Sequence, residues 1–435
     1  MSKILIKNGR IIDPANQLDK QADLLIDQGK IASVGKNLKA SGAQVIEADG
    51  KWVLPGFIDL HVHLRSPGQE EKETVQTGAR AAAVGGFSSI CAMANTDPVA
   101  DRRPMIEFLV SEAQRVGLVN VLPVGAVTKG LKGESLAEMG ELQKAGAVAF
   151  SDDGHSIMNS NLMRRALEYT KMFDAPILAH EEDTLLSAEG VMHEGEISLR
   201  QGVAGIPSAA ESVMVSRDLL LVKATGGKLH LCHMSTQEAV EMIRWAKKQK
   251  LPVTAEVTPH HLSLTEDDLA EHDPVFKMKP PLCASDDQKA LRDALADGTI
   301  DAVATDHAPH TNADKELGLK AAPFGVIGLE TALGVVMTRL VHPGALSPQR
   351  LAESLSFRPA QILGIDKGTL SVGAPADVTI VDPDLEWTVT PDSFESKSQN
   401  CPFMGWKLKG KVTDLLVGGR EIVRAGNITA EVTVS

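Results

Sequence analysis

"GFIDLHVHLRSPG", at residues 56–68, places two histidines, His61 and His63, inside an apolar run. The run predicts a β-strand buried on both faces, because apolar residues occupy both of its alternating sets of positions. Side chains at i and i+2 of a strand point to the same face, so the two imidazoles lie side by side. Such a pair in a buried strand favours a metal site over a simple core hydrogen-bonding role.

Seven further short apolar strands follow along the chain, and helical patterns separate them. We predict the eight strands at residues 57–64, 87–92, 119–124, 147–151, 176–180, 229–233, 252–257 and 301–305. The helical patterns include residues 73–84, 134–145, 161–173, 208–225 and 236–249. Strands that alternate with helices are typical of parallel βαβ units, and eight such units fit a closed (β/α)8 TIM-type barrel of the α/β class.

Three β-rich stretches near the chain ends are alike: residues 22–35, 376–389 and 413–426. Each is expected to form a short β run, a turn and a second β run, and Gly418-Gly419 is a tight hairpin signal in the third. One stretch is N-terminal and two are C-terminal. We therefore predict a small β-sandwich domain built from residues 1–55 and 359–435, with the barrel between them at residues 56–358.

Composition narrows the class of protein. The chain has 435 residues, which suits a barrel of roughly 250 residues plus a second unit. A net charge of −13 argues against a nucleic-acid or anionic-membrane partner, since both attract basic patches. The four cysteines form no CxxC pair, and neither a signal peptide nor a membrane-spanning apolar run is recognisable. These features predict a cytoplasmic protein with reduced thiols.

Histidines and aspartates recur where the predicted strands end, and barrel enzymes build their active sites at these carboxyl ends. Besides the first pair, the residues in such positions are Asp152, Asp153, His155, His180, His233, Asp306 and His307. Imidazole and carboxylate ligands suit zinc or a similar divalent ion. Four histidines and two aspartates exceed one tetrahedral site, and they suit two ions that share a bridging carboxylate.

Some positions stay open at this level. Periodicity does not decide whether Asp152 or Asp153 binds metal while the other caps a loop or helix. His260 and His261 follow the seventh predicted strand, where they are candidates for the barrel mouth. The remaining histidines have no convergent partner in the sequence, so we expect surface or core roles for His155, His193, His230, His272 and His342.

These motifs resemble the amidohydrolase superfamily and, within it, the class I dihydroorotases. "DLHVHLRSPGQEEKET" (59–74) is similar to the signature around the HxH pair of that family. "ATDHAPH" (304–310) resembles its strand-eight motif, and "AAPFGVIGLETAL" (321–333) resembles its active-site loop and following helix. "FSDDG", "LAHEED" and "LCHMST" occur in the expected order, so the resemblance spans nearly the whole chain, including the split β unit.

The resemblance implies two zinc ions per subunit. His61, His63 and Asp306 would bind one ion, His180 and His233 would bind the other, and Asp153 and a hydroxide would bridge the two. Related dihydropyrimidinases and hydantoinases use a carboxylated lysine on strand four as the bridge. The fourth strand here, "AVAFSDDG", contains no lysine, which points to the class whose bridge is an aspartate.

The implied reaction is the reversible opening of the cyclic amide of dihydroorotate to N-carbamoyl-L-aspartate, a step of de novo pyrimidine (UMP) biosynthesis. Asp306 would be the catalytic general base and then the general acid. Arg65 lies two residues after His63, so its planar fork is expected to bind the substrate carboxylate at the same mouth. By resemblance, the other substrate-binding residues would be Asn95 and His310, with the backbone of Pro323, Phe324 and Gly325 along the ring.

Two stretches depart from the family pattern. One is "MANT" (93–96), where the family commonly has proline before the asparagine. "MKPPLC" has Lys279 and Cys283 where the family usually has asparagine and arginine. We expect Lys279 to bind substrate still, as a point charge instead of an amide.

Two alternatives remain. The chain is another cyclic amidohydrolase, hydantoinase- or allantoinase-like, or it is a dihydroorotase-like scaffold subunit for aspartate transcarbamoylase. A scaffold would have lost metal ligands, and all six are present. A homodimer is expected, and an association of the active chain with aspartate transcarbamoylase stays open.

Overall fold

A closed parallel barrel forms the centre of the computed structural model, which describes residues 3–429. Its strands are hydrogen-bonded in chain order: β6 (Phe57–Val62), β7 (Phe87–Ala92), β8 (Asn120–Gly125), β9 (Ala149–Phe150), β10 (Ile177–Ala179), β13 (Leu229–Leu231), β14 (Val253–Val257) and β15 (Ala302–Val303). All six residues of β6 and of β7 are buried, as the apolar runs predict. The predicted eight-stranded barrel is confirmed.

The first and last strands meet through contacts just beyond their ladder. The backbone N–H of His63 donates to the carbonyl of His307 at 2.8 Å. The N–H of Thr305 donates to the buried carboxylate of Asp59 at 3.1 Å. These bonds close the barrel, so the residues after β6 and after β15 share one rim.

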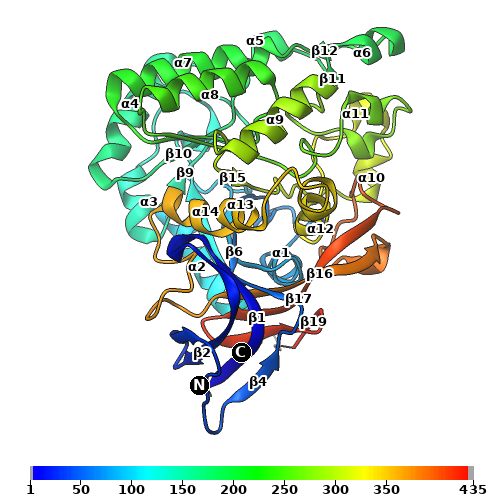
Figure 1. Ribbon diagram of the computed structural model, residues 1–435. Coiled ribbons are helices and arrows are strands. Elements are labelled where there is room, and N and C mark those ends of the chain that lie inside the picture. The colour runs from blue at the N-terminus through cyan, green and yellow to red at the C-terminus, as the bar shows by residue number, and fades with distance from the viewer. Residues whose placement is uncertain (1–2, 430–435) are drawn as a thin grey trace.

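Helices surround the barrel (Figure 1). The main ones are α1 (Val75–Val84), α2 (Arg103–Val116), α3 (Met139–Ala145), α4 (Ser160–Thr170), α7 (Ala209–Thr225), α8 (Gln237–Lys248), α9 (Ser285–Asp297), α12 (Ala332–Val336), α13 (Pro348–Ala352) and α14 (Arg358–Leu363). Their ends follow local capping rules: Thr74 accepts from the N–H of Thr77 to start α1, and Gly226 ends α7 at φ 69°. Within residues 3–429, no helix has the length and apolar character that a membrane span requires.

Short helices and strands are inserted at the rim of the barrel where the carboxyl ends of its strands lie. After β10 come α5 (Thr184–Ser187), β11 (Met192–His193), α6 (Glu196–Gln201) and β12 (Gly205–Ile206). After β15 come α10 (Asn312–Lys315) and α11 (Gly318–Ala321). These insertions build walls above the barrel mouth.

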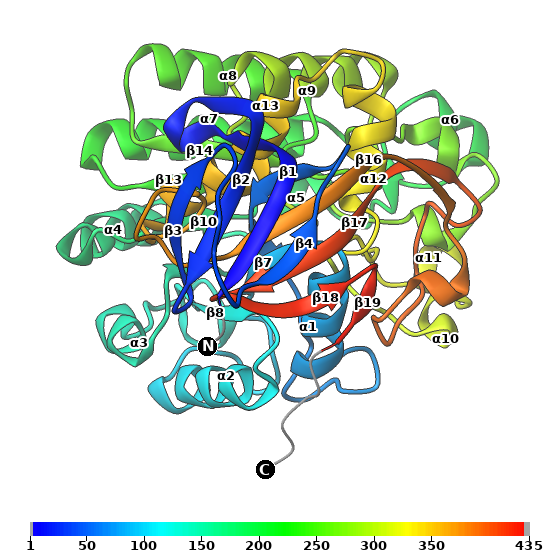
Figure 2. The same cartoon turned by 60° about the horizontal axis from the view of Figure 1, so that its bottom comes forward.

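Both chain ends contribute to one further sheet, which lies below the barrel in Figure 1 and comes forward in Figure 2. Its order is β19 (Asn427–Ile428), β18 (Arg420–Arg424), β17 (Lys407–Val417), β16 (Val378–Thr388), β5 (Trp52–Pro55), β1 (Ile4–Asp13), β2 (Leu18–Asp27) and β3 (Lys30–Gly35), and β4 (Gln44–Glu47) pairs with β1. The predicted β unit from both ends is confirmed, and its strands form one continuous sheet.

This sheet curls around its own core. The N–H of Ile31 in β3 donates to the carbonyl of Ala374, just before β16, and the N–H of Ala376 donates to the carbonyl of Gly29. Ile4, Ile26 and Ile380 are among the buried residues of one cluster inside the curl. We predicted two packed β layers. The structure has one continuous sheet, which bends so that two parts of it face each other across this core.

Two of the three β-rich stretches form hairpins, and the third does not. Residues 22–35 form β2 and β3, and residues 413–426 form β17 and β18 around Gly418-Gly419. Residues 376–389 instead form the single long strand β16. The strand contains a β-bulge where we predicted a turn. At this bulge the carboxylate of Asp382 accepts hydrogen bonds from the N–H groups of Asp384 and Leu385.

Helix α14 begins at residue 358, where we predicted the barrel unit to end. Ala360 and Leu363 of α14 pack in one cluster with Ile58 and Leu60 of β6. We propose that the barrel unit extends to about residue 363, because these side chains are part of the barrel core.

Candidate metal centre and active site

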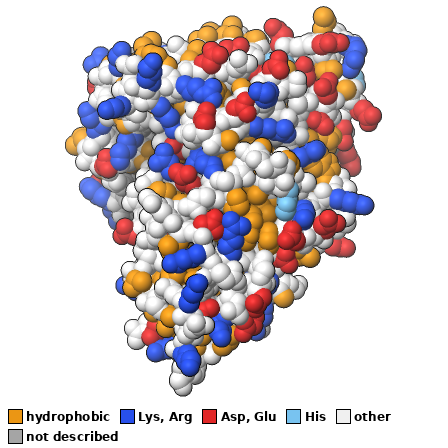
Figure 3. All heavy atoms as spheres, in the orientation of Figure 1, with side chains coloured by type: hydrophobic (Ala, Val, Ile, Leu, Met, Phe, Trp, Pro, Cys, Tyr) orange, Lys and Arg blue, Asp and Glu red, His pale blue; other side chains and the backbone are white. Residues whose placement is uncertain are grey.

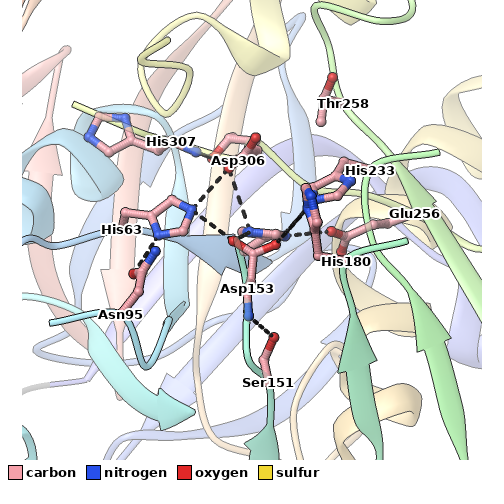
Figure 4. Close-up of polar contacts among 12 residues, drawn as sticks. His63, Asn95, Ser151, Asp153, His180, His233, Glu256, Thr258, Asp306 and His307 are labelled. Carbon is pink, nitrogen blue, oxygen red and sulfur yellow. Dashed lines mark hydrogen bonds and ion pairs between the residues drawn. The ribbon is translucent and has the colours of Figure 1, made fainter. Parts of the chain in front are cut away.

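The six predicted metal ligands converge at the carboxyl ends of the barrel strands, and Figure 4 labels five of them: His63, Asp153, His180, His233 and Asp306. His61 lies on β6 and His63 directly follows it, and the other four residues follow β9, β10, β13 and β15: Asp153, His180, His233 and Asp306. All six are at least nine-tenths buried. A rim shared by parallel strands brings together residues that are up to 245 positions apart in the chain, from His61 to Asp306.

Asp153 lies between two pairs of histidines. Its Oδ2 is 3.2 Å from Nε2 of His61 and 3.4 Å from Nε2 of His63. Its Oδ1 is 3.2 Å from Nε2 of His233 and 3.4 Å from Nδ1 of His180. Each carboxylate oxygen thus faces a different histidine pair, which is the arrangement of a carboxylate that bridges two metal ions.

The second aspartate belongs to one side of this arrangement. Oδ1 of Asp306 lies 3.1 Å from Nε2 of His63 and 3.5 Å from Nε2 of His61. On the other side, Nδ1 of His180 and Nε2 of His233 approach each other to 3.0 Å. The six groups therefore divide into a site with two histidines and Asp306 and a site with two histidines, with Asp153 common to both.

Three of the four imidazoles are held by their other nitrogen. Nδ1 of His61 donates to Oε1 of Glu256 at 3.0 Å. Nδ1 of His63 donates to Oδ1 of Asn95 at 2.9 Å, and Nε2 of His180 donates to Oε2 of Glu182 at 3.0 Å. Such bonds fix the tautomer and direct the free nitrogen at the centre, as is common behind metal-binding histidines.

The donor set fits divalent cations. Nε2 of His61 is completely buried and has no hydrogen-bond partner among the described residues, although it points at Asp153 and Asp306. Burial alone would raise the pKa of Asp153, but the surrounding imidazoles outweigh it and hold that pKa well below its usual range. A dense group of ionised carboxylates and imidazole nitrogens is a set of ligands for zinc or a similar ion.

Asp152 points away from the histidines. The periodicity of the sequence did not decide whether Asp152 or Asp153 faces the metal centre. Oδ1 of Asp152 accepts from the N–H groups of Val127 and Thr128 at 2.8 and 2.9 Å, and its Oδ2 accepts from the hydroxyl of Thr128. Asp152 thus stabilises the loop that follows β8, and Asp153 is the aspartate that faces the centre.

A cavity of about 540 Å³ opens above the histidines. It is lined by His63, Asp153, His180 and Asp306 and by all seven predicted substrate-binding residues: Arg65, Asn95, Lys279, His310, Pro323, Phe324 and Gly325. This volume is within the range of small-molecule sites. Metal and substrate residues that were predicted separately therefore share one space.

Arg65 is a buried cation on the wall of this cavity. Its Nε donates to the carbonyl of Pro309 at 3.3 Å, and one terminal nitrogen lies 3.4 Å from Nε2 of His310. Burial lowers the pKa of Arg65 to about 10, so the guanidinium remains charged at neutral pH. Burial and the charge of Arg65 also lower the pKa of His310, whose neutral ring donates from Nε2 to the carbonyl of Phe324 at 2.9 Å.

Lys279 lines the cavity and also forms an ion pair with an acidic residue. Its Nζ lies 2.8 Å from Oε1 of Glu182 and 4.8 Å from the centre of the Phe324 ring. Glu182 therefore contacts both Lys279 and the histidine His180. Cys283, the other departure from the family pattern, is buried beside a separate small cavity with His193, and its Sγ is 3.8 Å from Oγ of Ser235.

The histidines outside the predicted metal centre have several different roles. His230 donates to Glu256 at 3.0 Å, and His261 bonds the Thr258 hydroxyl and the Pro280 carbonyl, so both have core roles. His260 is buried and does not line the cavity. His155 is exposed and does line it, although the sequence offered no convergent partner for it.

Two supporting acids were missed from the sequence. Glu256 is an acid in the apolar strand "PVTAEV", and a charge in a buried strand is a signal that could have identified it. Glu182 follows His180 in "LAHEED", where nothing in the pattern separates it from its acidic neighbours.

Comparison with known proteins agrees with this geometry. A family model described as "Dihydro-orotase-like" matches residues 50–239. A dihydroorotase of Anaeromyxobacter dehalogenans is 52% identical over 98% of this chain and 99% of its own length, and one of Pelotomaculum thermopropionicum is 51% identical over 97% and 99%.

Solved structures give the same fold over the full chain. The L-hydantoinase (dihydropyrimidinase) of Arthrobacter aurescens matches with a TM-score of 0.90 at 28% identity, over 99% of this chain and 98% of that one. The dihydropyrimidinase of Brevibacillus agri matches with a TM-score of 0.86 at 26% identity, over 98% and 96%. The full-length relatives decide between these groups: the chain belongs to the dihydroorotase family of cyclic amidohydrolases.

Proposed function

We propose that this dihydroorotase opens the ring of dihydroorotate reversibly to N-carbamoyl-L-aspartate, with two zinc ions held by the six convergent residues. The observation that carries the proposal is the position of Asp153, whose two oxygens face two different histidine pairs. The cavity above them supplies a buried arginine for a carboxylated substrate.

His61, His63 and Asp306 would hold one ion, His180 and His233 the other, and Asp153 both. Such a pair of ions supplies a water of lowered pKa and polarises a carbonyl oxygen. Three of the four histidines are oriented before substrate arrives, since buried partners hold the rings of His61, His63 and His180 from behind.

Asp306 is the group placed to move a proton. It would accept the proton of the attacking water and deliver it to the ring nitrogen that leaves, as a general base and then a general acid. Proton transfer of this kind typically contributes roughly 10²–10⁴-fold to the rate. Burial opposes ionisation of Asp306, but the neighbouring imidazoles His61 and His63 outweigh it and lower its pKa, so the group starts as the base.

Substrate recognition falls to the other residues of the cavity. The guanidinium of Arg65 would bind the carboxylate in a bidentate manner. Asn95, Lys279 and His310 would contact the polar edges of the substrate, and the backbone of residues 323–325 would lie along the ring.

The experiment combines turnover with metal content. Purified protein is assayed with dihydroorotate, hydantoin and allantoin while bound zinc is measured per chain. We expect turnover of dihydroorotate alone and about two zinc ions per active subunit. Turnover of only hydantoin or allantoin would replace the substrate proposal, and a metal-free protein without turnover would favour a scaffold.

We further propose a cytoplasmic homodimer. All four cysteines are free and buried, as expected of reduced thiols. Leu185, Leu199 and Leu220 are 83%, 83% and 56% exposed on α5, α6 and α7, which is apolar surface that a second copy would cover.

On the face drawn in Figure 3, described basic and acidic side chains are interspersed without a large basic cluster, which does not favour a nucleic-acid partner. Sedimentation of the purified protein, alone and with aspartate transcarbamoylase, tests both association proposals.

A further inference from the structure

Two buried lysines behind residues 323–325, which line the cavity, have no acidic partner in the part of the chain that the structure describes. Lys277 is 2% exposed and Lys315 is 8% exposed. Lysines are rarely buried unless they are paired with a carboxylate. Within residues 3–429 neither ammonium group lies within 4.0 Å of a carboxylate oxygen, so something other than an ion pair must account for their positions.

Lys277 binds the end of α11. Its Nζ donates to the carbonyls of Leu319, Lys320 and Ala322 at 2.7, 3.1 and 2.7 Å. The last carbonyls of a helix have no partner within the helix, and they carry the negative end of its dipole. One ammonium group therefore satisfies three backbone acceptors at the point where the chain leaves α11 for the substrate wall.

Lys315 makes the reciprocal set of bonds from the end of α10. Its Nζ donates to the carbonyls of Pro274, Lys277 and Pro323 at 3.1, 3.1 and 2.9 Å. The N–H of Gly325 also donates to the carbonyl of Lys277, at 3.0 Å. Residues 274–277 and 315–325 are thus bound to each other on both sides of Pro323.

The segment held in this way is the part of the cavity that faces substrate. Pro323, Phe324 and Gly325 line the cavity, and Nζ of Lys277 lies 4.4 Å from the centre of the Phe324 ring. Phe324 also accepts from His310 through its carbonyl. Its own N–H has no hydrogen-bond partner among the described residues, so this donor remains available to a ligand.

We propose that Lys277 and Lys315 are positioning residues of this dihydroorotase, which hold Pro323–Gly325 in the conformation that binds substrate. The inference rests on the proposed function. Neither lysine lines the cavity, so each acts through the backbone that it holds. A loop of this kind has no ladder of its own, and three donors on one flexible side chain supply the order that a strand would otherwise provide.

The test uses the metal-loaded enzyme and the variants K277M and K315M, which retain an unbranched side chain without the ammonium group. We expect each variant to raise KM for dihydroorotate about tenfold while kcat changes by less than about threefold, since binding is lost and the chemistry is not. Because both lysines hold one segment, the double variant should raise KM about as much as the larger single change, instead of by their product.

A partly buried lysine elsewhere, which does have an acidic partner, provides the control. Lys247 pairs with Asp301 at 2.7 Å before the start of β15, at the opposite end of the barrel. K247M should lower thermal stability and leave KM unchanged. K277R and K315R, which keep a charge and several donors, should restore KM to within about threefold of the wild type. Where a methionine variant fails to fold, K277Q or K315Q takes its place, because the amide retains two donors.

The possible failures are distinguishable. Unchanged KM in folded variants, a loss confined to kcat, or independent multiplicative effects in the double variant would each overturn the positioning role while the wild type still turned over dihydroorotate. A wild-type enzyme that does not act on dihydroorotate would instead remove the proposed function, and this inference with it.

Discussion

The two walls of the cavity are built in different ways. The metal wall consists of side chains at the ends of barrel strands, and buried groups such as Glu256 and Asn95 hold their far sides. The opposite wall is largely backbone at Pro323–Gly325, in a loop outside any strand. The strand ends are held by the hydrogen-bond ladders of the barrel sheet, whereas the conformation of the loop depends on individual hydrogen bonds.

This difference separates chemistry from recognition. Groups that must meet a metal ion within tenths of an ångström come from the barrel, because small displacements of catalytic groups are costly. The groups proposed to select the substrate come partly from the loop at residues 323–325, outside the barrel strands, and partly from the rim, where Arg65 and Asn95 follow β6 and β7. Changes in the metal wall should therefore lower kcat, and changes in the opposite wall should raise KM.

The largest effect is expected at Asp306. The variant D306N removes the proton acceptor but keeps the size of the side chain, so kcat should fall by roughly 10²–10⁴-fold with little change in KM. Steady-state kinetics with metal analysis and a thermal melt check this. Turnover near the wild-type rate in a metal-loaded D306N protein would show that another group moves the proton.

The variant E256Q tests the support behind the metal wall. Glu256 accepts from both His61 and His230 at 3.0 Å. Loss of its charge should weaken metal binding or activity by roughly 10–100-fold, the usual effect of such outer partners. Metal affinity measured by competition with a chelator gives the answer, and unchanged affinity would mean that the ring of His61 is oriented by packing alone.

The variant R65A tests substrate recognition by the arginine that lines the cavity just after β6. Removal of the guanidinium should raise KM for dihydroorotate about tenfold or more, because charge-assisted bidentate bonds are lost, and kcat should change much less. Dihydrouracil, which lacks the carboxylate, is the matched control, and its turnover should not weaken further in R65A. An unchanged KM for dihydroorotate would rule out the assigned role.

The smallest effect concerns pH and the metal-free protein. Burial alone would lower the pKa of His180, but hydrogen bonds to Asp153 and Glu182 outweigh it and raise that pKa to about 9. A raised histidine pKa contributes stability that is complete below about pH 6.5 and is lost as pH rises through about 9. The melting temperature of the chelated protein should therefore fall by a few degrees over that window. A flat or rising profile would contradict the assignment.

Much of the metal wall was predictable from the sequence. Because parallel strands in a barrel present their carboxyl ends on one rim, an HxH pair and four later residues after strands were enough to predict a shared site. Periodicity did not separate the two adjacent aspartates. The family resemblance assigned the bridging place to Asp153, and the loop bonds of Asp152 show that Asp152 turns away from the histidines. The sequence pattern failed at residues 376–389, where a bulge and a turn have the same local composition.

The sequence by itself determined the barrel, the split sheet and the order of the predicted metal-binding side chains, because these depend on local periodicity and on residues at strand ends. Only the tertiary structure decided that Asp153 faces two histidine pairs and that Glu256 and Glu182 contact the histidine rings. It also decided that Lys277 and Lys315 bind the backbone at Ala322 and Pro323. The physical reason is that these contacts join loops and strands far apart along the chain, where periodicity carries no information about distance.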